Sequence, residues 1–248
     1  MLTLACCASA SRGSWREAVP LAAGAECITC AMDLFDDIEE GDVESYGSSS
    51  DLPILVNAAS ALLMLGVSCL TSVRRPRLAI EAVRFLARAF VAAANGQHTD
   101  MMLSETRITV DQAVEIAAGK TASLTSAICE AAALVGGASP RLAAQYGEFG
   151  FHLGLVAQLA DDLADFEEDL AVGKVSVPVA FLRGQSAAGE RKPAMSVPDT
   201  NGGGLWRSAA QQYAWLLADI HRRRARRVLQ AIERRRPALE YLEQFVAP

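Results

Sequence analysis

Two clusters of acidic residues at helical spacing constrain this chain more than any other feature of its sequence. The first is Asp36-Asp37-Ile38-Glu39-Glu40 and the second is Asp161-Asp162-Leu163-Ala164-Asp165. In each cluster the first acid is followed four positions later by another, and on an α-helix these two positions lie about 40° apart around the axis. Several like charges on one helical turn repel one another. The pattern therefore predicts two acidic helical faces whose charge is balanced by a cation.

Both clusters offer only carboxylate oxygens, and this limits the cations that they suit. Sites made of oxygen alone suit Mg²⁺, which keeps several water molecules and completes its coordination shell with substrate phosphates. The clusters therefore indicate Mg²⁺-dependent chemistry on a diphosphate.

Helical periodicity runs through most of the sequence, and we find no run of alternating strands. The hydrophobic fraction is 51% with only 6% aromatic residues, which is typical of closely packed helices. We expect an all-α fold in one domain over residues 1–248, with a flexible loop at about 184–204, where Gly, Ser and Pro are frequent. The predicted helices span about 2–10, 16–40, 52–72, 76–98, 110–135, 139–170, 175–183 and 205–246.

Composition argues against several classes of protein. The net charge of −6 disfavours nucleic acid as a partner. The Cys27-x-x-Cys30 pair has no second pair or histidine cluster to complete a zinc site, so we expect six buried free thiols in a reducing cytoplasm. The first residues lack the basic and long apolar regions of a signal peptide. We identify no run of about 18 uncharged apolar residues and expect no transmembrane segment.

Arginines gather near the C-terminus, in His221–Arg227 and again at 234–236. Apolar residues such as Leu216, Ile220 and Val228 recur on one side of the same predicted helix. This pattern fits a terminal helix with a solvated basic face, or a helix that contacts an anionic substrate or partner.

Five short motifs follow one another along the chain. They are an aspartate-rich motif at Asp36–Asp42, a GQxxD at Gly96, Gln97 and Asp100, a KT pair at Lys120-Thr121, an FGxxxGxxxQxxDDxxD from Phe149 to Asp165, and a DLxxGKxxxPVxxAL-like stretch that begins at Asp169. In this order they resemble the motifs of trans-isoprenyl diphosphate synthases, the polyprenyl synthetase family. The resemblance covers most of residues 2–183. It implies a class I isoprenoid synthase fold, an all-α helical bundle around a central cavity, here with its first helices missing.

The resemblance also implies roles for individual residues. Mg²⁺, as three ions with the bound diphosphate, would be held by two sets: Asp36, Asp37 and Glu40, and Asp161, Asp162 and Asp165. Lys120 and Lys174 would pair with phosphate oxygens, while Gln97, Asp100 and Gln158 would orient water, phosphate or the lysines. Together they would ionise an allylic isoprenoid diphosphate, and an apolar pocket would shield the allylic cation from water. A homodimer is expected from the resemblance alone.

Three features depart from the family pattern. Family members carry an Arg pair a few residues after the first motif, but Asp42–Gly47 contains no Arg, and Arg74-Arg75 lies too far downstream. They also begin with a GGKRxRP-type segment, and this chain starts after that point. Asp33 stands one turn before the first motif, where the family usually has an apolar residue. We therefore expect the ionising half of the site to be present and the half that binds isopentenyl diphosphate to be lost.

Three activities remain open at this point. The first is a prenyltransferase of isoprenoid biosynthesis, with another acceptor in place of isopentenyl diphosphate. The second is a terpene synthase-like cyclase or lyase that acts on one allylic diphosphate, which the loss of the Arg pair favours. The third is a non-catalytic subunit of a heteromeric prenyl synthase, which the missing helices favour and the intact motifs oppose. A translation start upstream of Met1 would restore the missing segment.

Overall fold

The computed structural model describes residues 1–43, 46, 51–103, 108–188, 203–233 and 240–246, and its regular elements in this part of the chain are all helical. The all-α prediction is confirmed. In chain order the elements are α1 (Leu2–Ser11), η1 (Arg16–Ala18), α2 (Val19–Glu40), α3 (Leu52–Thr71), α4 (Pro76–Leu103), α5 (Val110–Ala117), η4 (Ala118–Ala122), α6 (Ser123–Val135), α7 (Pro140–Ala164), α8 (Phe166–Val172), α9 (Val177–Ala188), α10 (Gly203–Glu233) and α11 (Glu240–Glu243). η1 is a 3₁₀ turn and η4 is a π-helical turn.

The predicted helix over 139–170 is broken inside the second acidic cluster. α7 ends at Ala164, and α8 begins at Phe166. Asp165 lies between them with φ −95° and ψ 5°. The first turn of α8 contains Glu167, Glu168 and Asp169. A helix N-terminus carries partial positive charge, which stabilises these acids better than a continuous helix would.

Other boundaries also differ from the predictions. The predicted helix over 110–135 contains the π-helical turn η4 between α5 and α6. The predicted loop begins too early, because α9 continues to Ala188. The rest of that loop, 189–202, lies outside the described residues. So do residues 234–239, which interrupt the predicted helix over 205–246.

The chain forms two compact units. Unit 1 contains Met1–Arg88, Ala127–Gly147 and Leu229–Gln244, and unit 2 contains Ala89–Ser126, Glu148–Val228 and Phe245–Pro248. The helices α4, α6, α7 and α10 each contribute residues to both units. A single domain stays a prediction.

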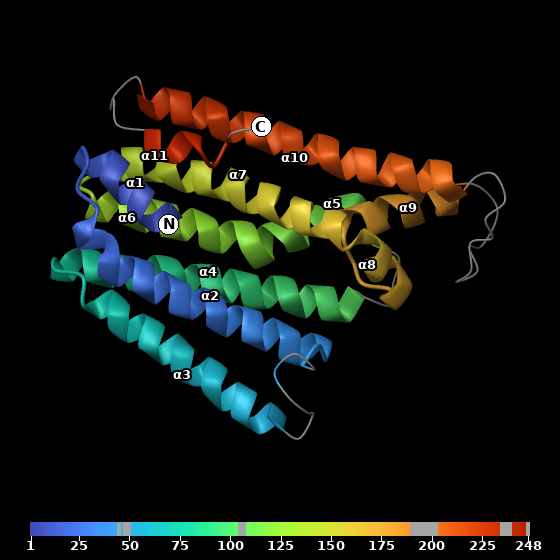
Figure 1. Cartoon of the computed structure of the whole chain (residues 1–248), viewed down its shortest axis with the longest axis horizontal. Coiled ribbons are helices and arrows are strands. Elements are labelled where there is room, and N and C mark those ends of the chain that lie inside the picture. The colour runs from blue at the N-terminus through green and yellow to red at the C-terminus, as the bar shows by residue number, and fades with distance from the viewer. Residues whose placement is uncertain (44–45, 47–50, 104–107, 189–202, 234–239, 247–248) are drawn as a thin grey trace. The chain divides into compact units, whose positions relative to one another are not determined.

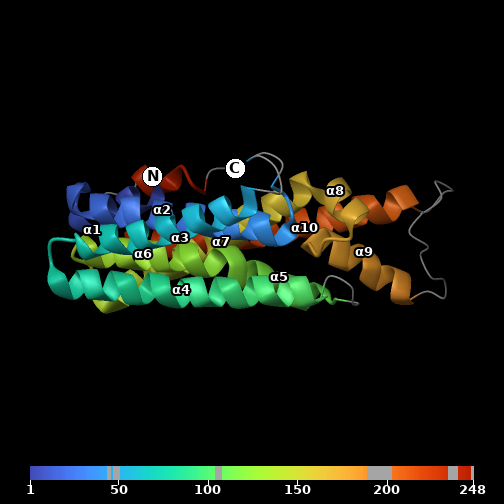
Figure 2. The ribbon, with the colours of Figure 1, turned by 90° about the horizontal axis from the view of Figure 1, so that it is seen from below.

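In unit 1, α2 lies along α3, as Figures 1 and 2 show. Glycines let the two backbones touch: a Cβ added at Gly24 would stand 2.8 Å from the carbonyl oxygen of Gly66. One added at Gly66 would stand 2.7 Å from Cγ1 of Ile28. This contact fixes α2, whose last turns carry the first acidic cluster. Gly41, with φ +80°, then ends α2, a conformation that glycine adopts without strain.

In unit 2, an apolar cluster fixes the end of α7. Leu159, two residues before the second acidic cluster, is buried in this group. The cluster joins it to α5, α9 and α10 through Ile108, Ala113, Ile116, Val175, Val177, Ala180, Ala214 and Ala218. Apolar packing therefore holds α7 in place just before the second acidic cluster begins.

A buried histidine pair joins α7 to α10 in the same unit. Nδ1 of His152 lies 3.0 Å from Nδ1 of His221, and the rings meet edge to face. Burial lowers the pKa of His152, with Glu148 opposing the shift and Arg224 adding to it. Burial, the His152 ring and Arg224 together lower the pKa of His221 to about 4. Both rings are therefore neutral at pH 7.

All six cysteines are free, as predicted. Cys6, Cys7 and Cys129 are buried, but Cys27 and Cys69 are half-buried and Cys30 is exposed, so the expectation that all six are buried was wrong. Periodicity placed them on helices without deciding which helical face each one occupies.

Two stretches are long and apolar enough to cross a membrane by length and composition. They are Arg16–Glu40, with mean hydropathy 1.4, and Leu52–Thr71, with mean hydropathy 2.0. The expectation of no such run overlooked the second stretch, which contains no charged residue. Buried residues make up 33% and 17% of their apolar windows. Core helices of soluble proteins pass the same test, so the finding is one of composition alone.

The histidine pair predicts a stability that depends on pH. The unfolded chain binds a proton at His221 near its ordinary pKa of 6.5, whereas the folded chain does so only near 4. Between these values the unfolded state holds more protons at this histidine, so the contribution of His221 to the free energy of unfolding should fall as the pH falls from about 6.5 to 4. Asp162, whose pKa is raised by burial, acts in the opposite direction in the wild type and in the variant alike. Urea unfolding at pH 7 and pH 5 should therefore show a smaller loss of stability for His221→Gln than for the wild type.

The matched control is His98→Gln, since His98 is the third histidine and is exposed. This variant should lose the same stability as the wild type between the two pH values. An equal loss in all three proteins would contradict the assignment to the buried pair.

Candidate functional site

A buried ion pair lies where α4 meets the π-helical turn η4 in unit 2. Nζ of Lys120 is 3.3 Å from Oδ2 of Asp100, and both side chains are largely buried. The two segments approach closely at Gly96, where an added Cβ would stand 3.1 Å from the backbone nitrogen of Lys120. Glycine at this position therefore lets the lysine reach the aspartate. π-helical turns of this kind are frequent at functional sites.

Two buried polar side chains in the same unit lack protein partners. Neither Nε2 nor Oε1 of Gln97 has a hydrogen-bond partner among the described residues, and the same holds for the hydroxyl of Ser176. A buried polar group without a partner costs about 1–3 kcal/mol. These atoms are therefore candidates to bind water, phosphate or a ligand of a metal. Gln97 was among the predicted residues, while nothing in the sequence pointed to Ser176.

Asp162 is engaged by protein donors at both of its oxygens. Nε2 of Gln158 donates to Oδ1 and the backbone N–H of Val177 donates to Oδ2, each at 3.0 Å. Oγ1 of Thr121 in turn donates to Oε1 of Gln158 at 2.5 Å. This relay connects η4, α7 and the N-terminus of α9. Burial raises the pKa of Asp162 to about 6, although both donors act in the opposite direction.

Asp161 and Asp165 differ from Asp162 because both are exposed. They lie one turn apart, and the backbone N–H of Asp165 donates to the carbonyl of Asp161 at 2.9 Å. Partial burial, and then the charge of Asp165, raises the pKa of Asp161. Asp162 is thus buried while Asp161 and Asp165 are exposed, and the metal-binding role of the three aspartates stays a prediction.

Lys174 follows the end of α8, where Gly173 has φ +82°. The backbone N–H groups of Gly173 and Lys174 both donate to the carbonyl of Asp169 at 2.9 Å. Lys174 is half-buried, and the backbone donor Val177 lies three residues after it. The contact between Asp162 and Val177 therefore also restrains the segment that carries Lys174.

The first acidic cluster lies at the end of α2 in unit 1, where Asp36 and Asp37 are half-buried and Glu40 is exposed. The hydroxyl of Tyr46 donates to Oδ2 of Asp37 at 2.7 Å. Burial raises the pKa of Asp33, and the charge of Asp37 one turn away adds to this shift. Asp33 therefore extends the acidic face by one turn, which its i, i+4 spacing from Asp37 signals. Tyr46 carried no such sequence signal.

The donor set of each cluster fits Mg²⁺ only as part of a larger shell. In the part of the chain that the structure describes, no group of three His, Cys, Asp or Glu side chains is placed to hold a metal by itself. Mg²⁺ takes one or two protein carboxylates and fills its shell with water and phosphate. Asp161 with Asp165, and Asp36 with Glu40, offer such pairs at i, i+4 spacing.

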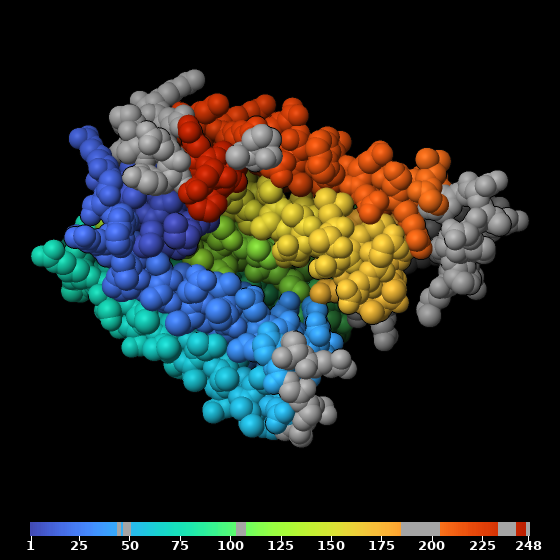
Figure 3. Space-filling model, viewed as in Figure 1, coloured from blue at the N-terminus to red at the C-terminus, as the bar shows by residue number. Residues whose placement is uncertain are grey.

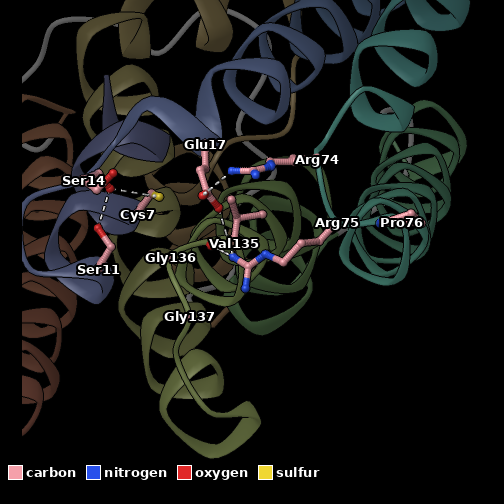
Figure 4. A pocket seen from close by; sticks show the side chains of 10 residues that line it. All are labelled: Cys7, Ser11, Ser14, Glu17, Arg74, Arg75, Pro76, Val135, Gly136 and Gly137. Carbon is pink, nitrogen blue, oxygen red and sulfur yellow. Dashed lines mark hydrogen bonds and ion pairs between the residues drawn. The ribbon is translucent and has the colours of Figure 1, made fainter.

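A cavity of about 560 Å³ lies elsewhere in unit 1, where three interhelical turns meet (Figure 4). Arg74 and Arg75 lie 4.0 and 3.3 Å from the carboxylate of Glu17, and Arg75 also donates to the carbonyl of Val135. Burial raises the pKa of Cys7 in this cavity to about 11, so its thiol stays protonated. Glu17 precedes α2 and Asp36 stands near its end, which separates them by roughly 28 Å along the helix. These arginines are therefore too far from the acidic cluster to bind an anion beside it.

The three aspartates of the second cluster should respond differently to substitution. Asp162→Ala should lower the free energy of unfolding by about 1–3 kcal/mol, because it leaves the buried donors of Val177 and Gln158 unpaired. The matched variant Asp161→Ala should change it by less than about 0.5 kcal/mol, because the side chain is exposed. Urea unfolding measures both values. Equal destabilisation by the two variants would contradict the division between a buried and an accessible carboxylate.

The sequence of this chain is similar to those of several known proteins. Residues 1–179 match the polyprenyl synthetase family. A geranylgeranyl diphosphate synthase of Mycobacterium tuberculosis is 31% identical over 199 residues, which cover 73% of this chain and 57% of that protein. The short chain isoprenyl diphosphate synthase of Methanothermobacter thermautotrophicus is 26% identical, with 93% of this chain and 79% of that protein covered. The tryptophan prenyltransferase ComQ of Bacillus spizizenii is 28% identical over 143 residues, or 57% of this chain and 49% of ComQ.

Solved structures agree on the fold. A geranylgeranyl pyrophosphate synthetase from the archaeon Geoglobus acetivorans has a TM-score of 0.82 at 22% identity and covers 99% of this chain, which in turn covers 82% of that structure. A polyprenyl synthase from Caulobacter crescentus, complexed with calcium and isoprenyl diphosphate, has a TM-score of 0.78 at 23% identity, with coverages of 99% and 82%. The chain thus spans just over half of the Mycobacterium relative and about four fifths of these structures. Because the family match covers 179 of its 248 residues, the chain belongs to the polyprenyl synthetase family.

Proposed function

We propose that this protein is a Mg²⁺-dependent prenyltransferase that ionises an allylic isoprenoid diphosphate and transfers the prenyl group to an acceptor. One observation carries the proposal: unit 2 combines the accessible carboxylate pair Asp161 and Asp165 with the buried ion pair of Lys120 and Asp100. Oxygen ligands for Mg²⁺ and cationic donors for phosphate are the two requirements for stabilising a diphosphate leaving group.

The residues of this chain have separable tasks in the proposed reaction. Bound Mg²⁺ would supply Lewis-acid stabilisation of the leaving diphosphate. Lys120 and Lys174 attract the phosphate oxygens that receive the electron pair of the breaking C–O bond. Gln97 offers a free amide to water or phosphate, and Asp100 orients Lys120. The resulting allylic cation is captured by a nucleophile of the acceptor, which then loses a proton.

The acceptor is the feature on which this chain departs most from chain-elongating relatives. The segment 41–50 after the first cluster contains no Lys or Arg, so a second diphosphate lacks cationic donors there. ComQ is named as a tryptophan prenyltransferase, and its similarity to this chain supports an acceptor other than isopentenyl diphosphate. The same absence favours a second candidate, a terpene synthase-like reaction in which the cation cyclises or is quenched by water.

Incubation with Mg²⁺ and C10, C15 or C20 allylic diphosphates tests the ionising step. Diphosphate release should require Mg²⁺, and Asp36→Ala and Asp161→Ala should each slow it about 100-fold or more, because each removes a metal ligand. The measurement is the rate of diphosphate release, with circular dichroism to check that the helix content is unchanged. Asp111→Ala is the matched control, since Asp111 is an exposed acid on α5 outside the motifs, and it should keep the wild-type rate.

Product analysis with and without isopentenyl diphosphate decides between the activities. Hydrocarbons or alcohols formed without it would establish the terpene synthase-like reaction. Longer diphosphates formed only in its presence would show chain elongation, and the expected loss of the second diphosphate site would then be wrong. No release from any substrate would contradict the proposal and favour a non-catalytic subunit.

We also propose that the protein pairs with a second copy of itself through α3. Ile54, Met64 and Leu65 are 66%, 60% and 53% exposed. They lie on the side of α3 opposite the buried Ala59, Gly66 and Leu70. A helix without charge and with an apolar outer face is typical of an interface. The alternative partner for this face of α3 is a different subunit of a heteromeric enzyme.

The six free thiols support a reducing compartment such as the cytoplasm.

Sedimentation equilibrium tests the pairing. The wild type should have the mass of a dimer, and the double variant Met64→Glu, Leu65→Glu should have that of a monomer, because carboxylates resist burial in an apolar interface. Val172→Glu alters an exposed apolar residue of α8 and should remain dimeric. A wild-type monomer would contradict self-pairing through α3.

A further inference from the structure

The long helix α10 carries large apolar and aromatic residues on its exposed side. Its orange and red atoms lie at the surface in the space-filling view (Figure 3). Its large exposed residues are Leu205 at 73%, Trp206 at 47%, Trp215 at 59%, Leu216 at 52% and Ile220 at 38%. The buried side of the helix is formed by small and aliphatic residues, namely Ala210, Ala214, Ala218, Ala225, Leu229 and Ile232. The packing of the bundle therefore uses only the inner side of α10, and two of the three tryptophans of the chain lie outside it.

Towards the C-terminal end of α10 the exposed residues become positively charged. α10 contains six arginines against two acidic residues, although the whole chain has a net charge of −6. Five of the arginines fall between Arg222 and Arg227. Arg223 forms an ion pair with Asp219 at 2.7 Å and keeps 69% of its side chain exposed.

Helical geometry places the exposed apolar residues and the arginines on one stripe of α10. At 3.6 residues per turn, Leu205, Leu216, Arg223 and Arg227 lie within about 40° of one another, opposite the buried Ala214. Trp206 and Trp215 stand on the two flanks of this stripe. A surface that approaches α10 from outside would therefore meet the aliphatic residues and the guanidinium groups, with one indole at each margin of the contact.

An anionic lipid surface matches this combination. Indole rings concentrate at the boundary between lipid headgroups and acyl chains, where an apolar body and a polar N–H are both satisfied. Guanidinium groups bind lipid phosphates through paired hydrogen bonds. The outer face of α3, by contrast, carries no charged residue and therefore no cation that could pair with phosphate.

We infer that the outer face of α10 from Leu205 to Arg227 binds the surface of a bilayer that contains anionic phospholipid. The indoles and aliphatic residues enter the headgroup boundary, and the arginines contact the phosphates beside it. This inference stands apart from the proposed reaction, because it uses no residue of either acidic cluster and concerns lipid phosphates of the membrane rather than a substrate.

Co-sedimentation of the full chain with vesicles tests the inference. The protein should bind vesicles made of equal parts phosphatidylglycerol and phosphatidylcholine, and bind phosphatidylcholine vesicles far more weakly. Each basic residue near an anionic surface changes the partition coefficient about fivefold, so Arg223→Gln, Arg227→Gln should reduce binding roughly 25-fold. Trp206→Gln, Trp215→Gln should reduce it on vesicles of the same composition. High salt should weaken binding by the wild type, since the arginine contacts are screened.

The matched control is Arg77→Gln, Arg88→Gln, which removes the same charge from exposed positions on α4. This variant should bind as the wild type does. An equal loss in the control would show attraction by net charge alone and overturn the assignment to α10. Absence of binding to anionic vesicles, with α10 instead required for a complex with a protein, would also overturn it. Diphosphate release measured without vesicles is independent of all these results.

Discussion

The buried carboxylate of Asp162 is the interaction on which the arrangement of unit 2 depends. Its two oxygens accept hydrogen bonds from Gln158 on the same helix and from the first backbone N–H of α9. A carboxylate in this position is costly, as its raised pKa shows, and fixed donors at both oxygens offset that cost. The end of α7, the π-helical turn and the segment before α9 are therefore held together by one residue. The same contact also restrains the segment that carries Lys174.

Burial places three chemically identical side chains in two different environments. Asp162 faces inward and meets protein donors, while Asp161 and Asp165 face solvent one turn apart. The break of the helix at Asp165 contributes to this division, because it starts α8 with three acids at a favourable N-terminus. The exposed pair consequently has no need to act as a structural cap. Among the described residues neither carboxylate has an ion-pair partner, so their mutual repulsion suits a cation-binding role.

Much of the fold could be predicted from the sequence, because helical periodicity and glycine stops are local signals. The motifs also indicated Lys120, Asp100 and Gln97, and the structure brings Lys120 and Asp100 together. The break at Asp165 could not be read from periodicity, since both sides of it are helical. Tyr46 and Ser176 were missed because their positions depend on tertiary packing rather than on spacing. The separate role of Asp162 likewise required the position of α9, which lies 15 residues further along the chain.

The distribution of positive charge restricts the acceptor in the proposed reaction. In unit 1 the face formed by Asp33, Asp36, Asp37 and Glu40 is followed by a segment, 41–50, without Lys or Arg. Arg74 and Arg75 are bound to Glu17, roughly 28 Å back along α2 from Asp36. At that separation, beyond two Debye lengths at physiological salt, they provide little compensation for an anion beside the acidic face. A second diphosphate there would meet net negative charge, so the electrostatics of this chain favour an uncharged acceptor, or capture of the cation by its own double bond.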